Sequence, residues 1–166
     1  MAVSELRYFG DPVLKTPADP VTRFDQSVRT LVTDLLDTVQ LPGRAGLAAP
    51  QIGVGLRAFS YHVDGALGYV LNPEIVELSE GTHEIDEGCL SVPDLAFPTE
   101  RATHAVVRGV DVDGAEVTVS GEGRLAQCLQ HETDHLNGVL YLDRLTPERK
   151  REAFRAARQH DWFWQH

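Results

Sequence analysis

Residues 131–135 follow the pattern H-E-x-x-H, inside a stretch from Glu122 to Leu136 whose apolar spacing predicts a helix. Residues four positions apart lie one above the other on a helical face, so His131 and His135 can reach a single metal ion. Glu132 is rotated by about 100° from His131, and it can approach water at the metal without being a ligand. The same five residues also arise by chance on helices with two surface histidines. A metal site needs at least a third ligand from elsewhere in the chain.

The third ligand could come from a residue after the H-E-x-x-H motif. In thermolysin-like zinc enzymes this ligand is a glutamate after the motif, and the nominal candidates here are Asp143, Glu148 and Glu152. The metzincin pattern continues as H-E-x-x-H-x-x-G-x-x-H. The chain follows that pattern as far as Gly138 but has Tyr141 in place of the last histidine, which excludes the metzincin class.

The better candidate is Cys89, which lies upstream in the run EGCLS at 87–91. Its glycine, serine and following Val-Pro indicate a tight turn that presents a side chain. A free cysteine is more often a small buried hydrophobe, and we assign Cys128 to this class. Cys128 lies three residues before His131, and helix geometry is expected to point it away from the ligand pair into the core. A Cys-His-His set with water in the fourth position is typical of a catalytic metal site.

Length and composition predict one domain over residues 1–166. The chain is 42% hydrophobic and 24% charged, and its net charge of −10 argues against binding nucleic acid through a general positive field. Its start lacks the apolar run of a signal peptide, and no stretch approaches the ~18 apolar residues that span a bilayer. The two cysteines are then expected to be free thiols in a reducing compartment. We therefore expect a cytoplasmic protein without membrane contact.

The predicted helices are separated by segments of other kinds. The first twenty residues, rich in Pro and Asp, are expected to form an extended arm with turns. Apolar residues spaced by three and four predict a helix over 25–39, ended by Pro42 and Gly43. Pro147 can begin a last helix at its first turn.

Strands are predicted between the helices. Short strands are expected at 57–61, 69–71 and 74–78, and a hairpin is expected from 105–112 and 116–119 around Asp113-Gly114. The segment 46–51 is interpreted as a shaped loop. Strands followed by helices without regular alternation predict an α+β fold.

Three motifs together resemble the signature segments of the peptide deformylase family. They are GLAAPQ at 46–51, EGCLS at 87–91 and QHETDHLNG at 130–138, in the family's order and at similar spacing. The opening LRYFGDPVL is also similar to that family's start, so the likeness runs from about Leu6 to Leu145. The resemblance implies an α+β fold with antiparallel sheets packed around a central metal-binding helix, and a C-terminal helix.

The resemblance also implies the activity. The chain would remove the N-formyl group from the N-terminal formylmethionine of nascent polypeptides and release formate. Cys89, His131 and His135 would hold one divalent ion, most often iron(II) in this family, and zinc or nickel can occupy such sites. Water at the metal would be the nucleophile, and Glu132 would be the general acid/base.

Further roles carried by the resemblance concern the substrate. Gln51, through its side-chain amide, and Leu90, through its backbone N–H, would stabilise the developing oxyanion. Gly46 would pair with the substrate backbone as a strand does, and Ala45 and Glu87 would be further substrate-binding residues.

Two positions depart from the family pattern. Many members begin the first motif with Gly-x-Gly, and Arg44 occupies the first of these glycines here, after Gly43. Arginine resists backbone angles that glycine permits. Many members also carry an arginine about seven residues after the ligand cysteine, where this chain has Ala96. Arg101 is retained and is a candidate partner of Glu87.

Two other functions are compatible with the H-E-x-x-H motif alone. A zinc peptidase would cleave internal peptide bonds with a carboxylate as third ligand. A binding module with a structural Cys-His-His site would have a closed fourth position, and it would have no need of an oxyanion donor such as Gln51.

The C-terminal segment is basic in an otherwise acidic chain. Arg149, Lys150, Arg151, Arg155 and Arg158 follow one another over ten residues, after Arg144. They form either a solvated helix face, with Glu148 and Glu152 as ion-pair partners, or a surface that contacts ribosomal RNA through its phosphates.

Overall fold

The computed structural model describes residues 3–164. The single domain expected over 1–166 stays a prediction, because residues 1–2 and 165–166 lie outside the described part. None of the helices in 3–164 has the length and apolar character needed to cross a bilayer.

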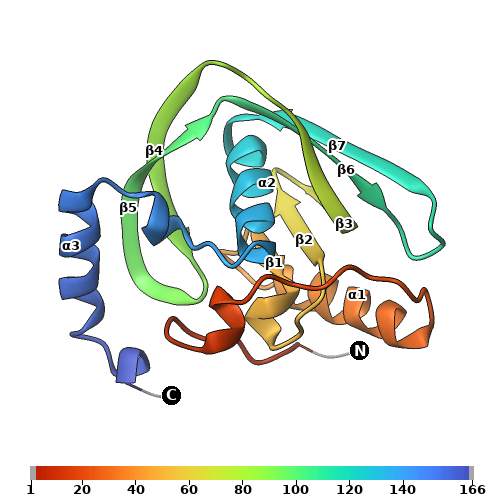
Figure 1. The fold of residues 1–166 in the computed structure, drawn as a ribbon, viewed down its shortest axis with the longest axis horizontal. Helices are drawn as coiled ribbons and strands as arrows, with labels where there is room; N and C mark the ends of the chain where they lie inside the picture. The colour runs from red at the N-terminus through yellow and green to blue at the C-terminus, as the bar shows by residue number, and fades with distance from the viewer. Residues whose placement is uncertain (1–2, 165–166) are drawn as a thin grey trace.

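Two antiparallel sheets flank a central helix. The described strands are β1 (Gly46–Ala48), β2 (Ala58–Val63), β3 (Ala66–Leu78), β4 (Thr82–Cys89), β5 (Val92–Ala102), β6 (His104–Val110) and β7 (Glu116–Glu122). One sheet has the order β1-β2-β3-β6-β7, and β4 and β5 form the other. Figure 1 shows helix α2 (Gly123–Leu136) in the middle of the molecule, with the β4–β5 hairpin on one side of it. The predicted α+β architecture around a central helix is confirmed.

Helix α1 (Gln26–Val39) is an ordinary amphipathic helix, as predicted. Asp25 caps it, since its carboxylate accepts a hydrogen bond from the N–H of Ser27 at 3.1 Å. Leu31, Leu35 and other apolar residues of one face are buried against the five-stranded sheet. Ser60 of β2 donates to the carbonyl of Leu35 at 3.0 Å, which ties the helix to the strand.

The last helix, α3 (Pro147–Ala157), begins at the predicted proline. Thr146 caps it by accepting a hydrogen bond from the N–H of Arg149. It packs outside β5, on the far side of the hairpin from α2 (Figure 1). The short 3₁₀ helices are η1 (Pro12–Lys15), η2 (Ala49–Ile52), η3 (Tyr141–Arg144) and η4 (Asp161–Trp164).

The prediction of a loop at 46–51 is wrong. Residues Gly46–Ala48 form strand β1, which pairs with β2, and Ala49–Ile52 form η2. The strand is three residues long and small-sided, so it shows no alternation that a sequence pattern could detect.

The two strands predicted at 69–71 and 74–78 are one strand, β3, which also begins earlier. Asn72 has a left-handed φ of 51°, and the register with β6 shifts between Leu71 and Glu74. The amide of Asn72 exchanges two hydrogen bonds with the backbone of Val21, at 2.7 and 3.0 Å. The apparent break is therefore a bulge beside Pro73, which has no N–H to donate.

The hairpin predicted around Asp113-Gly114 is confirmed as β6 and β7, and Gly114 has a φ of 78°. The β4–β5 hairpin is not anticipated beyond its turn. It is half exposed, and the sequence of β4, THEIDEGC, contains a single large apolar residue. The predicted tight turn is present, because Leu90 and Ser91 connect Cys89 to its partner Val92.

Candidate metal centre and substrate pocket

Three predicted ligands converge at one place. Cys89 ends β4, and His131 and His135 lie on successive turns of α2. Their donor atoms all lie within 4.8 Å of one another. The Sγ of Cys89 is 3.3 Å from Nε2 of His135, which is 3.1 Å from Nε2 of His131. The downstream candidate Asp143 is engaged elsewhere, accepting hydrogen bonds from Lys15 and from the backbone of Leu140.

The surroundings of this group suit a divalent cation. Burial lowers the pKa of His131, but the charge of Glu132 and hydrogen bonds with Cys89 and Glu87 outweigh it, so the net shift is well upward. These same groups would stabilise a bound cation. Burial and the charge of His131 lower the pKa of His135 well below its usual value, which favours the neutral, metal-binding ring. Thiolate and imidazole donors suit iron, zinc and nickel.

Glu87 orients His131 from behind. Its Oε2 lies 2.6 Å from Nδ1 of His131, and Arg101 bonds both of its oxygens, at 2.6 and 2.9 Å. Burial raises the pKa of Glu87, but the hydrogen bonds from Arg101 and His131 prevail and lower it to about 2. The Glu87–Arg101 pair is therefore present as anticipated. The expectation that Glu87 binds substrate stays a prediction: both of its oxygens are engaged by Arg101 and His131, and the residue also lines the pocket described below.

Glu132 has the properties of a proton carrier. It is buried, its Oε2 lies 3.9 Å from Nε2 of His131, and its Oε1 has no hydrogen-bond partner. Burial raises the pKa of Glu132 to about 7, and the charge of His131 opposes that rise. A carboxyl group in this state can take up and release a proton near neutral pH.

Gln51 points its amide nitrogen at the ligand group. Its Oε1 accepts a hydrogen bond from the N–H of Ala48 at 2.9 Å, which fixes the amide orientation. Its Nε2 donates to Ser91 Oγ at 3.1 Å and lies 3.7 Å from the sulfur of Cys89. An N–H donor is thereby held next to Cys89, one of the three converging residues.

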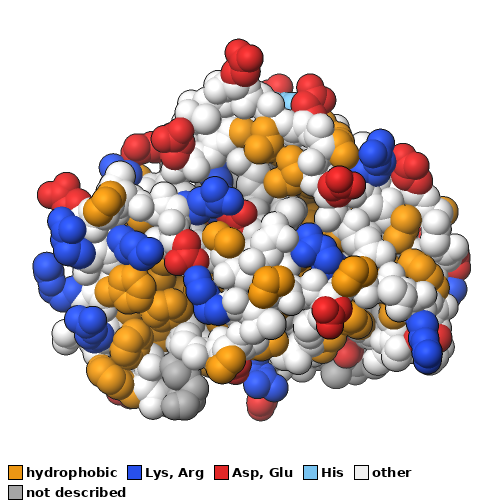
Figure 2. Space-filling view, in the orientation of Figure 1, with side chains coloured by type: hydrophobic (Ala, Val, Ile, Leu, Met, Phe, Trp, Pro, Cys, Tyr) orange, Lys and Arg blue, Asp and Glu red, His pale blue; other side chains and the backbone are white. Residues whose placement is uncertain are grey.

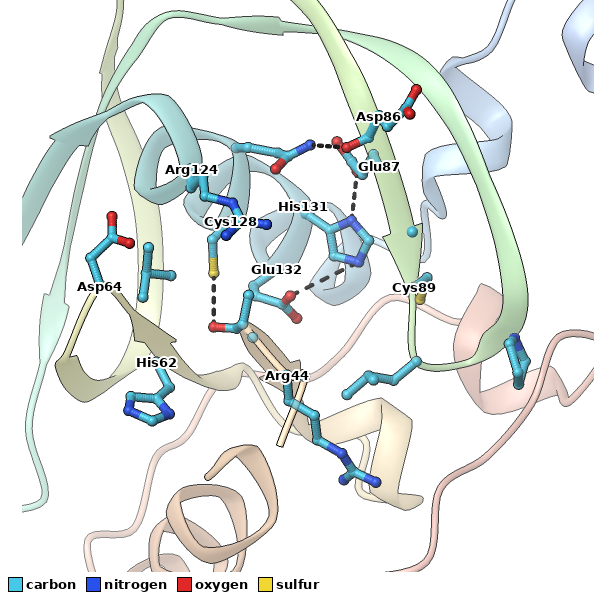
Figure 3. A pocket seen from close by; sticks show the side chains of 18 of the residues that line it. Arg44, His62, Asp64, Asp86, Glu87, Cys89, Arg124, Cys128, His131 and Glu132 are labelled. Atoms are coloured by element: carbon cyan, nitrogen blue, oxygen red, sulfur yellow. Dashed lines mark hydrogen bonds and ion pairs between the residues drawn. The ribbon is translucent and has the colours of Figure 1, made fainter. Parts of the chain in front are cut away.

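A pocket of about 610 Å³ opens in front of this group. Figure 3 shows Cys128, His131 and Glu132 projecting from α2 into it, with Cys89 on the neighbouring strand β4. The sequence-predicted residues Ala45, Gly46, Glu87 and Leu90 also line it.

The segment from Gly43 to Gly46, the first residue of strand β1, forms one wall of the pocket, and β1 is an edge strand of its sheet. A Cβ at Gly46 would collide with the carboxylate of Glu132 and the sulfur of Cys128, so any larger residue there would displace these two pocket side chains. The left-handed turn before the strand occurs at Gly43, with a φ of 81°. Arg44 therefore needs no glycine-like angle, and it donates a hydrogen bond to the carbonyl of Thr38 at 3.2 Å.

The burial predicted for Cys128 is confirmed. It is buried and is not part of the ligand group, as expected. It also reaches the pocket wall, where its Sγ lies 3.5 Å from the carbonyl of Ala45. Glu132 is four residues later, so both side chains share one helical face. Burial, and then the charges of Glu132 and Glu87, raise the pKa of Cys128 well above its usual value, so its thiol stays protonated.

Sequence reasoning missed Asp134 and Arg144. Asp134 is the second variable residue of the H-E-x-x-H motif, and it is buried between Arg101 and Arg144. Its burial among charged partners has no signature in the sequence, because Arg101 is 33 residues away.

Chemically, a buried carboxylate beside one thiol and two imidazole donors is typical of the metal-dependent hydrolase class. Comparison with known proteins narrows this class. The model of the polypeptide deformylase family matches residues 3–151. The peptide deformylase of Acidothermus cellulolyticus is 53% identical over 162 residues, which cover 98% of this chain and 89% of that protein. Peptide deformylase 1 of Corynebacterium glutamicum is 47% identical, over 98% of this chain and 99% of its own.

Solved structures agree. A peptide deformylase from Legionella pneumophila superposes with a TM-score of 0.88 at 41% identity, covering 95% of both chains. One from Ehrlichia chaffeensis in complex with actinonin gives a TM-score of 0.88 at 33% identity, covering 97% of this chain and 99% of its own.

The chain belongs to the peptide deformylase family. It is thus a metal-dependent hydrolase of protein biosynthesis, and it removes the N-formyl group from the N-terminal methionine of nascent polypeptides. This membership excludes both the zinc peptidase and the structural metal module.

Proposed function

We propose that Glu132 is the general acid/base of deformylation, and that Cys89, His131 and His135 hold the metal. The observation that carries this assignment is a buried, unpartnered carboxylate oxygen beside the three donors, in a group whose pKa is raised to about 7. When bound, a divalent ion supplies a Lewis acid that acidifies water and polarises a carbonyl. Glu132 takes a proton from the attacking water and later gives it to the departing amine nitrogen. The C–N bond of the formamide breaks, and the products are formate and a free α-amino group.

We propose that Gln51 and the backbone N–H of Leu90 stabilise the negative charge that develops on the formyl oxygen. The anchored amide of Gln51 supports this role, because its N–H₂ is held toward the ligand group before substrate arrives. One such preorganised donor typically contributes about 3–4 kcal/mol to the transition state.

Substrate recognition is assigned to the edge of β1. An extended peptide can add to an edge strand through main-chain hydrogen bonds, and Gly46 and Ala45 lie at that edge within the pocket. Glu87 orients His131 and, since it also lines the pocket, stays a predicted substrate-binding residue. Since actinonin is present in the Ehrlichia chaffeensis structure, we propose it as a probe of this pocket.

The test of the acid/base role measures formate release from formyl-Met-Ala-Ser by anaerobically purified protein, with metal analysis of the same sample. Glu132→Gln should keep the ion and lose nearly all turnover, whereas Cys89→Ala should lose the ion itself. Glu148→Gln, an exposed glutamate of α3, is the matched control and should behave as the parent. Full turnover by Glu132→Gln would disprove its assignment.

We propose iron(II) as the native ion. The thiolate of Cys89 suits iron, zinc or nickel, and a thiolate ligand leaves such a site open to oxidation. Metal analysis after anaerobic purification should find iron, and exposure to air should reduce activity. A zinc-only preparation with full activity that is stable in air would contradict this proposal.

We also propose that α3 contacts ribosomal RNA. Arg149 is paired with Glu84 at 3.0 Å, whereas Arg151, Arg155 and Arg158 are exposed. Figure 2 shows basic side chains around a hydrophobic patch on the side of the molecule where α3 lies, and Lys150, Arg151, Phe154, Arg155 and Arg158 line a hollow there. Phosphate contacts favour such a surface.

Co-sedimentation with ribosomes at increasing salt tests this contact. Reversing Arg151, Arg155 and Arg158 to glutamate should abolish it. The matched control reverses three exposed arginines elsewhere, Arg23, Arg29 and Arg108. Equal co-sedimentation by both triple variants would reject the contact.

A further inference from the structure

Asp134 is enclosed by two arginines although it lies next to His135 in α2. Arg101 Nη1 lies 2.7 Å from Oδ2 of Asp134. Arg144 forms a fork on the same carboxylate, with Nε 3.0 Å from Oδ2 and Nη2 2.7 Å from Oδ1. Bidentate pairs of this kind combine charge with fixed geometry.

The contacts continue inward to a proposed metal ligand. Arg101 forms a second fork on Glu87, and Glu87 lies 2.6 Å from Nδ1 of His131. The side chain of Arg144 is 51% exposed, whereas those of Asp134 and Arg101 are only 8% and 3% exposed. A line of charge-assisted hydrogen bonds therefore connects the protein surface to His131.

The charges alternate along this line. Arg144 and Arg101 are positive, and Asp134 and Glu87 are negative, so the four side chains compensate one another. Without Arg144, two buried carboxylates would share one guanidinium. Arg101 would then be drawn toward Asp134, and its hold on Glu87 would weaken, because an uncompensated buried charge is strongly unfavourable.

We propose that Arg144 is a positioning residue for the metal centre. By neutralising Asp134, it leaves Arg101 free to hold Glu87 against His131, which aims Nε2 of His131 at Cys89 and His135. The inference rests on the metal site proposed above. The Arg144–Asp134 pair differs in this respect from an ordinary exposed ion pair, which contributes little to stability.

The test measures the affinity of metal-free protein for Zn²⁺ by competition with a chromophoric chelator. Loss of a partner beyond the ligands typically weakens metal binding by 10–100-fold, and we expect about tenfold for Arg144→Ala. Arg144→Lys should weaken it by about threefold, because an ammonium group keeps the charge but not the fork. The matched control is Arg29→Ala, since Arg29 also lies 2.7 Å from a carboxylate, Asp113, and its side chain is 46% exposed.

A second measurement, the thermal unfolding of the metal-free variants, separates positioning from general stability. Arg144→Ala should unfold at a lower temperature than Arg29→Ala, because Asp134 is buried, so the Zn²⁺ affinities are compared at a temperature where both variants are folded. A purely structural role would lower the unfolding temperature and leave the affinity of the folded variant unchanged. Affinity within about twofold of the parent would overturn the inference, as would an equal loss in Arg29→Ala. If Arg144→Ala fails to fold, Arg144→Lys decides by the same criterion. Failure of the parent itself to bind Zn²⁺ would instead reject the metal site.

Discussion

Helices α1 and α2 have the same length, fourteen residues, but α2 buries a run of polar side chains that α1 lacks. The buried face of α1 is almost entirely apolar, and its polar residues are largely directed outward. The second half of α2 buries six consecutive polar residues, Gln130 to His135. Burial of α1 stabilises the fold directly through the hydrophobic effect, whereas burial of α2 is tolerated only where each polar group finds a partner.

The buried polar side chains of α2 differ in whether they have hydrogen-bond partners. Gln130 bonds the backbone of Ala102 through both its oxygen and its nitrogen, and Thr133 donates to the carbonyl of Leu129. Buried side-chain atoms of α2 without a partner belong to Glu132 and His135, the residues beside the proposed metal site. One helix thus supplies stability, and the other supplies chemistry that its neighbours must support.

The largest effect on activity is expected from removing a proposed metal ligand on α2. His135→Ala should lose the metal and lower kcat/KM by about 10³-fold or more, since the acid/base step and the Lewis acid would both be impaired. The three apolar clusters stay intact, so circular dichroism should show a folded protein. An active His135→Ala variant that retains its metal would break the division between the two helices.

A core deletion in α1 should give the opposite result. Leu35 is fully buried, and Leu35→Ala should lower the free energy of unfolding by about 3 kcal/mol through lost burial and a cavity. Urea denaturation measures this loss. Turnover per folded molecule should not change, and a large fall in kcat would show that α1 also positions the site.

Replacing a buried polar residue of α2 outside the ligand group should lower the stability of the fold without changing metal binding. Gln130→Ala leaves the N–H and the carbonyl of Ala102 without their side-chain partner, and the expected loss is about 2 kcal/mol of unfolding free energy. Metal content, measured on the folded fraction, should stay at the parent's level. Loss of metal in proportion to stability would mean that the two roles of α2 are not separable.

The smallest effect is expected at the N-cap of α1. The hydrogen bond from the Ser27 hydroxyl is the largest influence on Asp25 and, with the backbone N–H groups of the cap, holds its pKa below its usual value. A lowered pKa in the folded state means that the carboxylate stabilises the protein above its unfolded pKa, and that this contribution disappears as pH falls through the folded value. Asp25→Ala should therefore lower the urea midpoint slightly at neutral pH, and the difference from the parent should vanish in strong acid. A difference that persists in acid would point to a contact other than the cap.

The different roles of α1 and α2 could largely be predicted from the sequence, because the features that define each helix lie close together in the chain. The apolar spacing of α1 and its Asp25 cap, and the H-E-x-x-H motif of α2, depend on residues within a few positions of each other. The convergence of Cys89 with the histidines was inferred from chemistry and family resemblance, and the structure brings these residues together.

Features that depend on distant partners could not be predicted in the same way. The amide of Asn72 bridges to Val21, 51 residues away. Strand β4 is polar and half exposed, so its pairing with β5 has no apolar signature. The burial of Cys128 was predicted from its spacing to His131, but its place at the pocket wall beside Ala45 depends on a contact 83 residues away.

The sulfur donor stands at the tip of a two-stranded hairpin, while the nitrogen donors belong to a helix more than forty residues later. An ion shared by them would add a further link between two parts of the chain that are also joined by polar contacts, such as Gln130 with Ala102 and Arg101 with Asp134. Closing a loop of that length restricts the unfolded chain, so the cofactor would also secure the hairpin. Amide hydrogen exchange in the hairpin would then report directly on metal loss, before any global unfolding.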